Sequence, residues 1–156
     1  LNEIPQEHEK IYSKSVSYYF KNEYRDNADQ ISNMTQSMIQ KGMDISSNEY
    51  IELVQNQAIK TDIFDKWMND NYDFVFTLAT TSESPKGLIY NDKPDSSLIW
   101  TYLGIPMMIC PKFKALNGMP FGFQVMTRKY FDNELINFTK LLKERGVITD
   151  SLVKNV

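Results

Sequence analysis

The sequence predicts an α/β fold, or an α+β fold when these residues are taken alone, with helices packed on a small β-sheet. Two observations support this prediction. In the first part of the chain, apolar residues recur every three or four positions, as in amphipathic helices. After Asp73 the chain changes to short runs of strand-forming residues separated by Gly and Pro. We expect one domain over residues 1–156, mainly helical over 6–69 and sheet-containing over 72–145.

Three helices are expected in the helical part. The first runs from about Gln6 to Tyr24 and the second from Ala28 to Lys41, with Gly42 as its C-cap. The third begins at Ser46 or Ser47 as the N-cap and ends near Asn69. It carries an apolar stripe that we expect to pack on a sheet or on another helix: Ile51, Val54, Ala58, Phe64 and Trp67. Burying one such side chain contributes about 1.5–3 kcal/mol, so the stripe suffices to dock the helix.

Three strands are expected after the third helix, at 74–78, 107–110 and 121–127. The last two are joined by a short polar loop, which favours an antiparallel pair. The unbroken apolar run at 107–110, closed by Pro111, predicts a strand buried on both faces. Three strands make a small sheet, so this pattern also indicates part of a larger one.

The remaining segments connect or follow these strands. Residues 79–97 form a long polar loop, and loops of that length tend to be functional or mobile. Residues 98–103 form a helical turn. Asp132 is the expected cap of a last helix, which runs from about Asn133 to Arg145 and ends at Gly146.

Composition argues against several classes of protein. The chain has 17 basic and 20 acidic residues, a near balance that gives no reason to expect a nucleic-acid or acidic-membrane partner. No apolar run reaches the roughly 20 residues of a membrane span. One Cys excludes an internal disulfide framework, and with one His the chain lacks zinc-site spacing. We therefore expect no cofactor, no metal and a cytoplasmic setting.

Two single residues are candidates for an independent catalytic site. His8 lies beside Glu7 and Glu9 near the start of a helix, which favours a solvated surface side chain. Cys110 lies in an apolar strand before a Pro, whereas a reactive thiolate needs exposure and nearby positive charge. We expect neither to be catalytic. The start of the chain is neither an initiator Met nor a signal peptide, so we also expect the chain to be cut from a longer one.

Four segments together resemble a known family in order and spacing. They are YDFVFTLAT at 72–80, LGIP at 103–106, GMPFGFQVM at 118–126 and FDNEL at 131–135. This pattern resembles the C-terminal portion of amidase signature enzymes, a family that includes amidases and amidotransferase A subunits. Two departures stand out. Leu78 replaces the family's usual Pro, and Ser37 and Met38 stand where many relatives carry an Arg that holds a substrate carboxylate, which disfavours that substrate type.

The resemblance implies an α/β/α sandwich and hydrolysis of a carbon–nitrogen bond by a Ser, cis-Ser, Lys triad. In that chemistry the Lys accepts a proton through the bridging Ser, while backbone N–H groups stabilise the oxyanion. These residues lie in an upstream strand and a Gly-Ser-rich loop that this chain lacks. Its Ser-Ser pairs, 46–47 and 96–97, have no flanking Gly. Loss of a triad nucleophile costs roughly a million-fold in a well-studied case, so we expect the chain alone to be inactive.

The resemblance also implies which residues approach the substrate. Thr77, Thr80 and Thr81 would contribute hydroxyls, with Asp95 and Trp100 at the end of the loop. The alternative is that Thr80 and Asp95 are turn residues and Trp100 is a core residue. We assign Gly104, Pro106, Gly122 and Gln124 to fold geometry.

The implied role is scaffold and one wall of a substrate pocket. The implied partners are the remainder of the amidase domain and a small amide substrate, with homo-oligomerisation as a further possibility. The alternative function is a non-catalytic binding or self-association module, in which an exposed sheet edge mediates the association.

Overall fold

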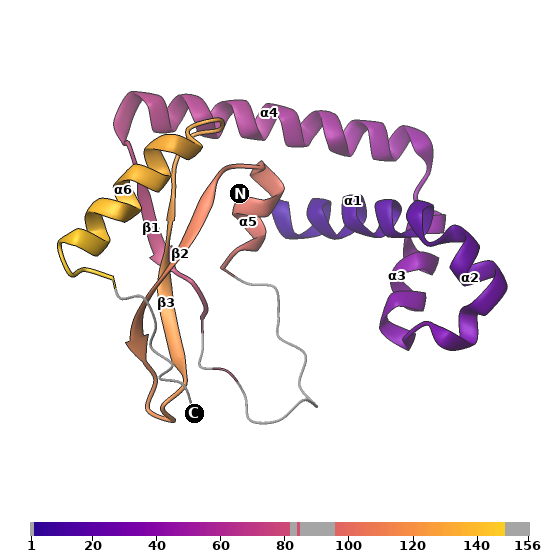
Figure 1. Cartoon of the computed structure of the whole chain (residues 1–156). Coiled ribbons are helices and arrows are strands. Elements are labelled where there is room, and N and C mark those ends of the chain that lie inside the picture. The colour runs from indigo at the N-terminus through magenta and orange to yellow at the C-terminus, as the bar shows by residue number, and fades with distance from the viewer. Residues whose placement is uncertain (1, 82–83, 85–95, 149–156) are drawn as a thin grey trace. The chain divides into compact units, whose positions relative to one another are not determined.

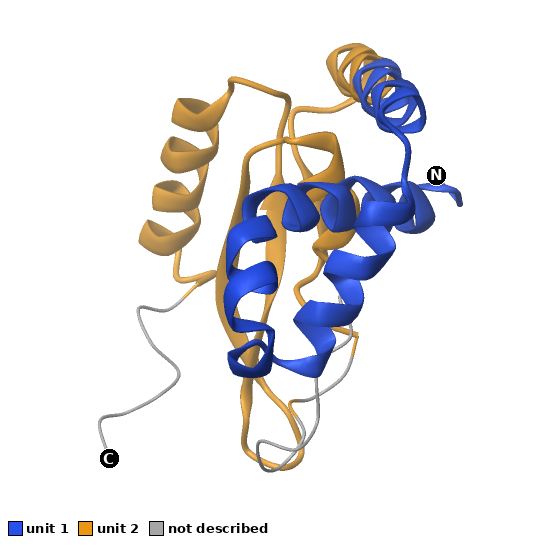
Figure 2. Cartoon of the chain, turned by 90° about the vertical axis from the view of Figure 1, so that its right-hand side faces the viewer, with its two compact units in different colours: residues 1–60 blue, residues 61–156 orange. Residues whose placement is uncertain are grey.

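A computed structural model describes residues 2–81, 84 and 96–148 of the chain (Figure 1). Its elements are α1 (Ile4–Tyr19), α2 (Lys21–Asn27), the 3₁₀ helix η1 (Ala28–Gln30), α3 (Asn33–Asp44), α4 (Ser47–Asn71), β1 (Val75–Leu78), α5 (Leu98–Leu103), β2 (Met107–Lys114), β3 (Pro120–Met126) and α6 (Asp132–Glu144). They fall into two compact units, residues 1–60 and 61–156, with the boundary inside α4 (Figure 2). The single-domain organisation expected from the sequence stays a prediction.

Unit 1 is helical, and its first helices are shorter than predicted. The helix expected over 6–24 is interrupted at Phe20, which leaves α-helical geometry between α1 and α2. The predicted start of the second helix, at residue 28, is also wrong. The hydroxyl of Ser32 accepts a hydrogen bond from the Thr35 N–H at 3.2 Å and so caps α3, which therefore begins at Asn33. The core of the unit contains Ile4, Val16, Ile39, Ile45 and Leu53.

Gly42 is not the C-cap predicted from the sequence. It lies inside α3 and is buried, because the backbone of α1 at Ser13 packs directly against it. A Cβ atom at this position would lie 2.0 Å from the backbone oxygen of Ser13. Glycine is required at this point for its lack of a side chain, and its conformational freedom is not used.

The predicted start of α4 is confirmed, but its predicted buried stripe is wrong. The Ser46 hydroxyl accepts a hydrogen bond from the Glu49 N–H at 3.1 Å, as an N-cap does. Leu53 and Met68 are the buried apolar residues of this helix. Most of the predicted stripe is exposed instead, and only Phe64 is half-buried; the exposed members are Ile51, Val54, Ala58 and Trp67.

The sheet of unit 2 has the strand order β1-β3-β2, and both pairings are antiparallel. The antiparallel β2–β3 pair is therefore confirmed. Two details of β2 were predicted wrongly. The strand continues through Pro111 to Lys114, with an irregularity between Pro111 and Phe113, and it lies at an edge of the sheet with 55% of Ile109 exposed. A Pro is tolerated in an edge strand because its missing N–H breaks no central ladder.

The two faces of the sheet are packed differently. On one face Cys110 of β2 and Val125 of β3 form a core with Leu135 of α6, and the stacked rings of Phe74 and Phe138 adjoin it. On the other face the paired residues Thr77 and Gln124 are polar. The face that packs on α6 therefore has an apolar core, and the other face carries this polar pair.

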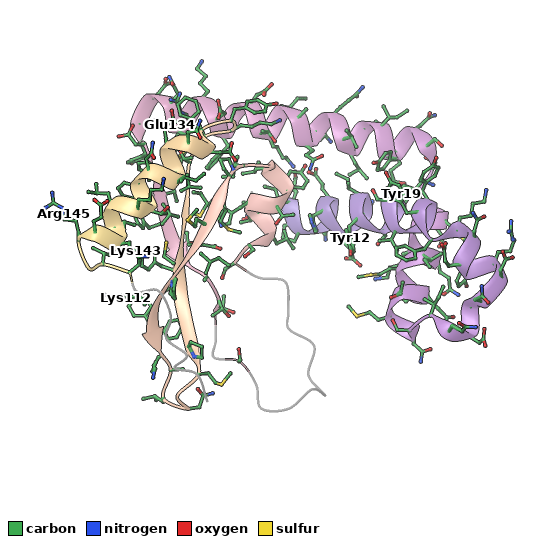
Figure 3. All side chains as sticks on the ribbon, in the orientation of Figure 1. Tyr12, Tyr19, Lys112, Glu134, Lys143 and Arg145 are labelled. Carbon is green, nitrogen blue, oxygen red and sulfur yellow. The ribbon has the colours of Figure 1, made fainter. Side chains whose placement is uncertain are left out.

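α6 closes the first of these faces, and it begins one residue earlier than predicted. Asp132 is the first residue of the helix and makes no capping hydrogen bond, so its predicted role as cap is wrong. The helix ends before Gly146, as predicted. Lys112 of β2 donates a hydrogen bond to the Gly146 carbonyl at 3.2 Å and ties the end of α6 to the sheet edge (Figure 3).

Replacing Gly42 by Ala should destabilise unit 1 by roughly 1–3 kcal/mol or more, because the new methyl group overlaps the Ser13 backbone. Urea denaturation followed by circular dichroism measures this change. Ser37→Ala, at an exposed position of the same helix, is the matched control and should change stability by less than about 0.5 kcal/mol. Equal stability of the two variants would contradict the close α1–α3 approach.

Candidate functional site: a polar cluster on the sheet

The candidate site is built around Gln124, which lies in the central strand β3 and is 0% exposed. Its side-chain N–H groups donate to the Thr77 hydroxyl on β1 and to the backbone oxygen of Ser96, each at 2.7 Å. Its amide oxygen accepts a hydrogen bond from the Ser97 hydroxyl at 3.3 Å. One buried amide thus joins β1, β3 and the residues that precede α5.

The structure brings only part of the predicted residue set together. Thr77 belongs to the cluster. Thr80 is half-buried and Thr81 exposed, and both follow the end of β1. Asp95 lies outside the described residues.

Trp100 lies in α5, one helical turn after Ser97. Its ring packs against Phe64 of α4 with the centroids 5.9 Å apart. Its indole N–H is buried and has no hydrogen-bond partner within the part of the chain that the structure describes. An unpaired buried donor of this kind costs about 1–3 kcal/mol, and an acceptor oxygen next to the indole would remove that cost.

Sequence reasoning missed Ser96 and Ser97 and assigned Gln124 to fold geometry. One signal for Gln124 was present, because an amide stands in an otherwise apolar strand and buried amides need partners. No comparable signal marked the two serines. They reach the cluster through a contact across more than 25 positions of the chain, which local pattern does not reveal.

An open apolar hollow of ≈ 530 Å³ lies on the α6-facing side of the sheet, opposite the Thr77 and Gln124 side chains, because Phe76, Leu78 and Phe123 alternate with them along β1 and β3. Thr77 contributes to its lining, and the other residues that line it are Phe76, Leu78, Phe113, Phe123 and Val147. A surface of this composition suits an apolar group, and the hydroxyl and amide groups of the cluster suit hydrogen bonding to a neutral polar group. The cluster contains no base positioned to activate a nucleophile.

The two residues considered for independent catalysis have other environments. Cys110 is fully buried in the core of unit 2, and this burial raises the pKa of its thiol. His8 is half-buried, more than predicted, and stacks on Tyr12 with the ring centroids 6.0 Å apart. In the described ranges, no three His, Cys, Asp or Glu side chains are grouped closely enough to hold a metal ion. No helix in those ranges has both the length and the hydrophobicity to cross a bilayer.

Comparison with known proteins gives matches in structure alone. No protein-family model and no curated protein sequence matches the chain. Among solved structures, an amidase matches with a TM-score of 0.78 and 15% identity, over 91% of this chain and 35% of its own. 6-Aminohexanoate cyclic dimer hydrolase matches with a TM-score of 0.73 and 12% identity, over 95% and 36%. A bacterial aryl acylamidase of the amidase signature family matches with a TM-score of 0.59 and 18% identity, over 86% and 32%.

The chain therefore has the fold of part of an amidase signature enzyme, and it spans about a third of the length of the enzymes that it matches. The resemblance and the mixed α/β fold class predicted from the sequence are confirmed at the level of fold. Identities of 12–18% carry no information on substrate or activity.

The Cys110 thiol should not react with DTNB in the native chain at neutral pH, because it is buried and its pKa is raised. It should react fully after denaturation in guanidinium chloride. Absorbance at the wavelength of the released thiolate measures both. Reaction of the native chain at the rate of a free cysteine would contradict the burial of β2 against α6.

Acidification should destabilise the chain through His8. Burial holds the pKa of the folded-state imidazole below its ordinary value of 6.5, so the unfolded chain binds the proton more tightly. Stability should therefore be unaffected by His8 above that value. It should fall as the pH drops through the window between 6.5 and the lower folded-state pKa.

Thermal denaturation between pH 5 and 8 tests this for the wild type and for His8→Gln. The chain has one histidine, so the variant should lose the decline in that window. An unchanged decline in His8→Gln would assign it to another group.

Proposed function

We propose that this chain is the C-terminal portion of an amidase-family hydrolase that cleaves carbon–nitrogen bonds of amides. In this proposal the chain supplies scaffold and one wall of the substrate pocket, and the remainder of the domain supplies the Ser, cis-Ser and Lys. The observation that carries the proposal is the match of 91–95% of the chain to about a third of an amidase and a dimer hydrolase. The order of the sequence motifs supports the same placement.

Exposed apolar surface supports the need for a partner. Phe76 and Leu78 of β1 are 50% and 55% exposed, and Ile51 and Trp67 of α4 are also exposed. Large exposed apolar surfaces of this kind are typical of interfaces. We infer that the remainder of the amidase domain covers them.

The two edges of the sheet differ in their residues, and this difference indicates which edge would pair with the rest of the amidase domain. The outer edge of β2 carries Pro111, Lys112 and Lys114, residue types that discourage further strand pairing. β1 consists of four uncharged residues without Pro, and within the described residues it pairs with β3 alone. The edge of β1 is therefore the one suited to accept a further strand from the rest of the domain.

The chemistry of the proposed enzyme follows from the family resemblance. The Lys would accept a proton through the cis-Ser, the nucleophilic Ser would attack the amide carbonyl, and backbone N–H groups would stabilise the oxyanion. The part assigned to this chain is to hold the substrate beside those groups. Correct placement of a reactant alone supplies a large share of catalysis, which makes a non-catalytic wall functionally important.

The chain alone should not hydrolyse small aryl or acyl amides, because the proposal assigns the nucleophile and its base to the remainder of the domain. A longer polypeptide from the same gene should hydrolyse at least one of them and should encode an upstream Lys and a Gly-Ser-rich loop. Release of free amine measures the reaction, and replacement of the loop Ser by Ala is the control. Upstream sequence without such a loop, or turnover by the chain alone, would contradict the proposal.

Self-association is the second candidate function, and the exposed β1 edge is the observation that favours it. If the edge pairs with a second copy, scattering-coupled size exclusion should show oligomers that grow with concentration. Leu78→Lys should reduce them because a charge blocks strand addition. Leu116→Lys, at a fully exposed position between β2 and β3, is the matched control and should not. A monomer at all concentrations would exclude this function.

A further inference from the structure

We propose that Gln124 is a positioning residue that orients the Thr77 hydroxyl as a hydrogen-bond donor to the carbonyl oxygen of a bound amide. The inference rests on the proposed function for the identity of the ligand. Its geometric part, the orientation of Thr77 by Gln124, does not depend on that function. Gln124 itself does not contact the ligand in this proposal.

The surroundings of the Gln124 side-chain amide fix its orientation. One side-chain N–H donates to the Ser96 backbone oxygen at 2.7 Å, and that oxygen can only accept. A flipped amide would place two carbonyl oxygens against each other at this distance. The Ser97 hydroxyl donates to the amide oxygen on the other side, which agrees with the same orientation. The second N–H must therefore donate to Thr77.

The orientation of the Gln124 amide determines the direction of the Thr77 hydroxyl hydrogen. A hydroxyl has one hydrogen and two lone pairs, and Gln124 occupies one lone pair through a 2.7 Å contact. The hydroxyl hydrogen must therefore point away from Gln124. Among the described residues its acceptor is the Leu78 backbone oxygen at 3.4 Å, well beyond the usual distance of about 2.7–2.8 Å for hydroxyl donors. That hydrogen is available to a better-placed oxygen.

The groups around the Thr77 hydroxyl determine which kind of oxygen atom suits it as an acceptor. The groups that meet at Gln124 are uncharged, namely two hydroxyls, one backbone carbonyl and the amide. A neutral carbonyl oxygen matches such a donor, whereas a carboxylate would lose its hydration without gaining a cation there. The ligand group that suits this donor is thus a neutral carbonyl, as in an amide.

The amide at position 124 does more than fill space. Gln124 is fully buried in the central strand. An apolar side chain of similar volume would fill the space but would leave the Ser96 backbone oxygen without the N–H that donates to it. What the amide adds is a fixed direction for the Thr77 hydroxyl and for residues 96–97.

The orientation is tested on the isolated chain by NMR of the Gln124 side-chain amide. In the wild type, both amide protons should exchange slowly with water, and one should show a nuclear Overhauser effect to the Thr77 methyl group. Thr77→Val should shift that proton and speed its exchange at least about five-fold, because a hydrogen bond of ordinary strength is lost. Thr77→Ser keeps the acceptor and should restore the wild-type signature, which a merely packing role of Thr77 would not do.

Two results would overturn the orientation. One is absence of the Thr77 contact in the wild-type spectrum, which needs no variant to fold. The other is equal behaviour of Thr77→Val and Thr77→Ser. Gln124→Met serves to assign the amide signals, since it removes them while keeping a side chain of similar length.

The ligand part is tested in the longer polypeptide that hydrolyses an amide. Thr77→Val and Gln124→Met should each lower kcat/KM about five-fold, and Thr77→Ser should restore it. Full activity of Thr77→Val would overturn the donor role even if the NMR signature is present. Failure of the proposed function is distinct, because hydrolysis would then be absent from every variant while the NMR signature of the isolated chain persists.

Discussion

The pairing of β3 with both of its neighbours is the constraint on which unit 2 depends. At Gly122 the two strands β2 and β3 approach so closely that a Cβ atom would lie 2.3 Å from the Cys110 backbone oxygen. This approach fixes the register in which Cys110 faces α6 beside Val125. The register of the other pair, β1 with β3, places Gln124 opposite Thr77 on the other face. A shift of one residue would exchange the two faces, so the core and the polar cluster exist only together.

The chain combines a well-packed core with apolar surface that its own described residues leave uncovered. Val125, Met126 and Cys110 are fully buried, whereas Phe76, Leu78 and Ile109 of the same sheet are half exposed. A chain with the fold of about a third of an amidase signature enzyme is expected to show this combination, because part of a larger sheet keeps its local core while surfaces that the larger fold covers stay exposed. The proposed role as scaffold and pocket wall explains both features.

The parts of the fold that local sequence determines were predictable. The Ser46 cap, the end of α6 before Gly146 and the antiparallel pairing of β2 with β3 each depend on neighbours in the chain. The order of strands was not predictable from pattern, because it depends on non-local pairing. The apolar run at 107–110 therefore suggested a strand buried on both faces, whereas the structure places β2 at the edge with Ile109 half exposed.

In the helices and in the site alike, contacts between residues far apart in the sequence could not be predicted from local pattern. Gly42 looked like a helix end, but its reason lies in a contact with Ser13 on another helix. Thr77 was reached through a family motif, whereas the link from Gln124 to the backbone of Ser96 depends on how the chain returns to the sheet. The Ser46 cap, which depends on a neighbour three residues away, was found, whereas Ser96 and Ser97, which act through distant contacts, were missed.

A crystal structure of the longer, active polypeptide with an uncleaved amide bound would show directly whether the sheet face with Thr77 and Gln124 holds the substrate. We expect the carbonyl oxygen of the bound amide to lie within hydrogen-bond distance of the Thr77 hydroxyl, roughly 2.5–3.2 Å, with Gln124 behind that hydroxyl and the nucleophile contributed by residues outside this chain. A ligand bound away from the sheet face that carries Thr77 and Gln124, or a nucleophile supplied by this chain, would contradict it.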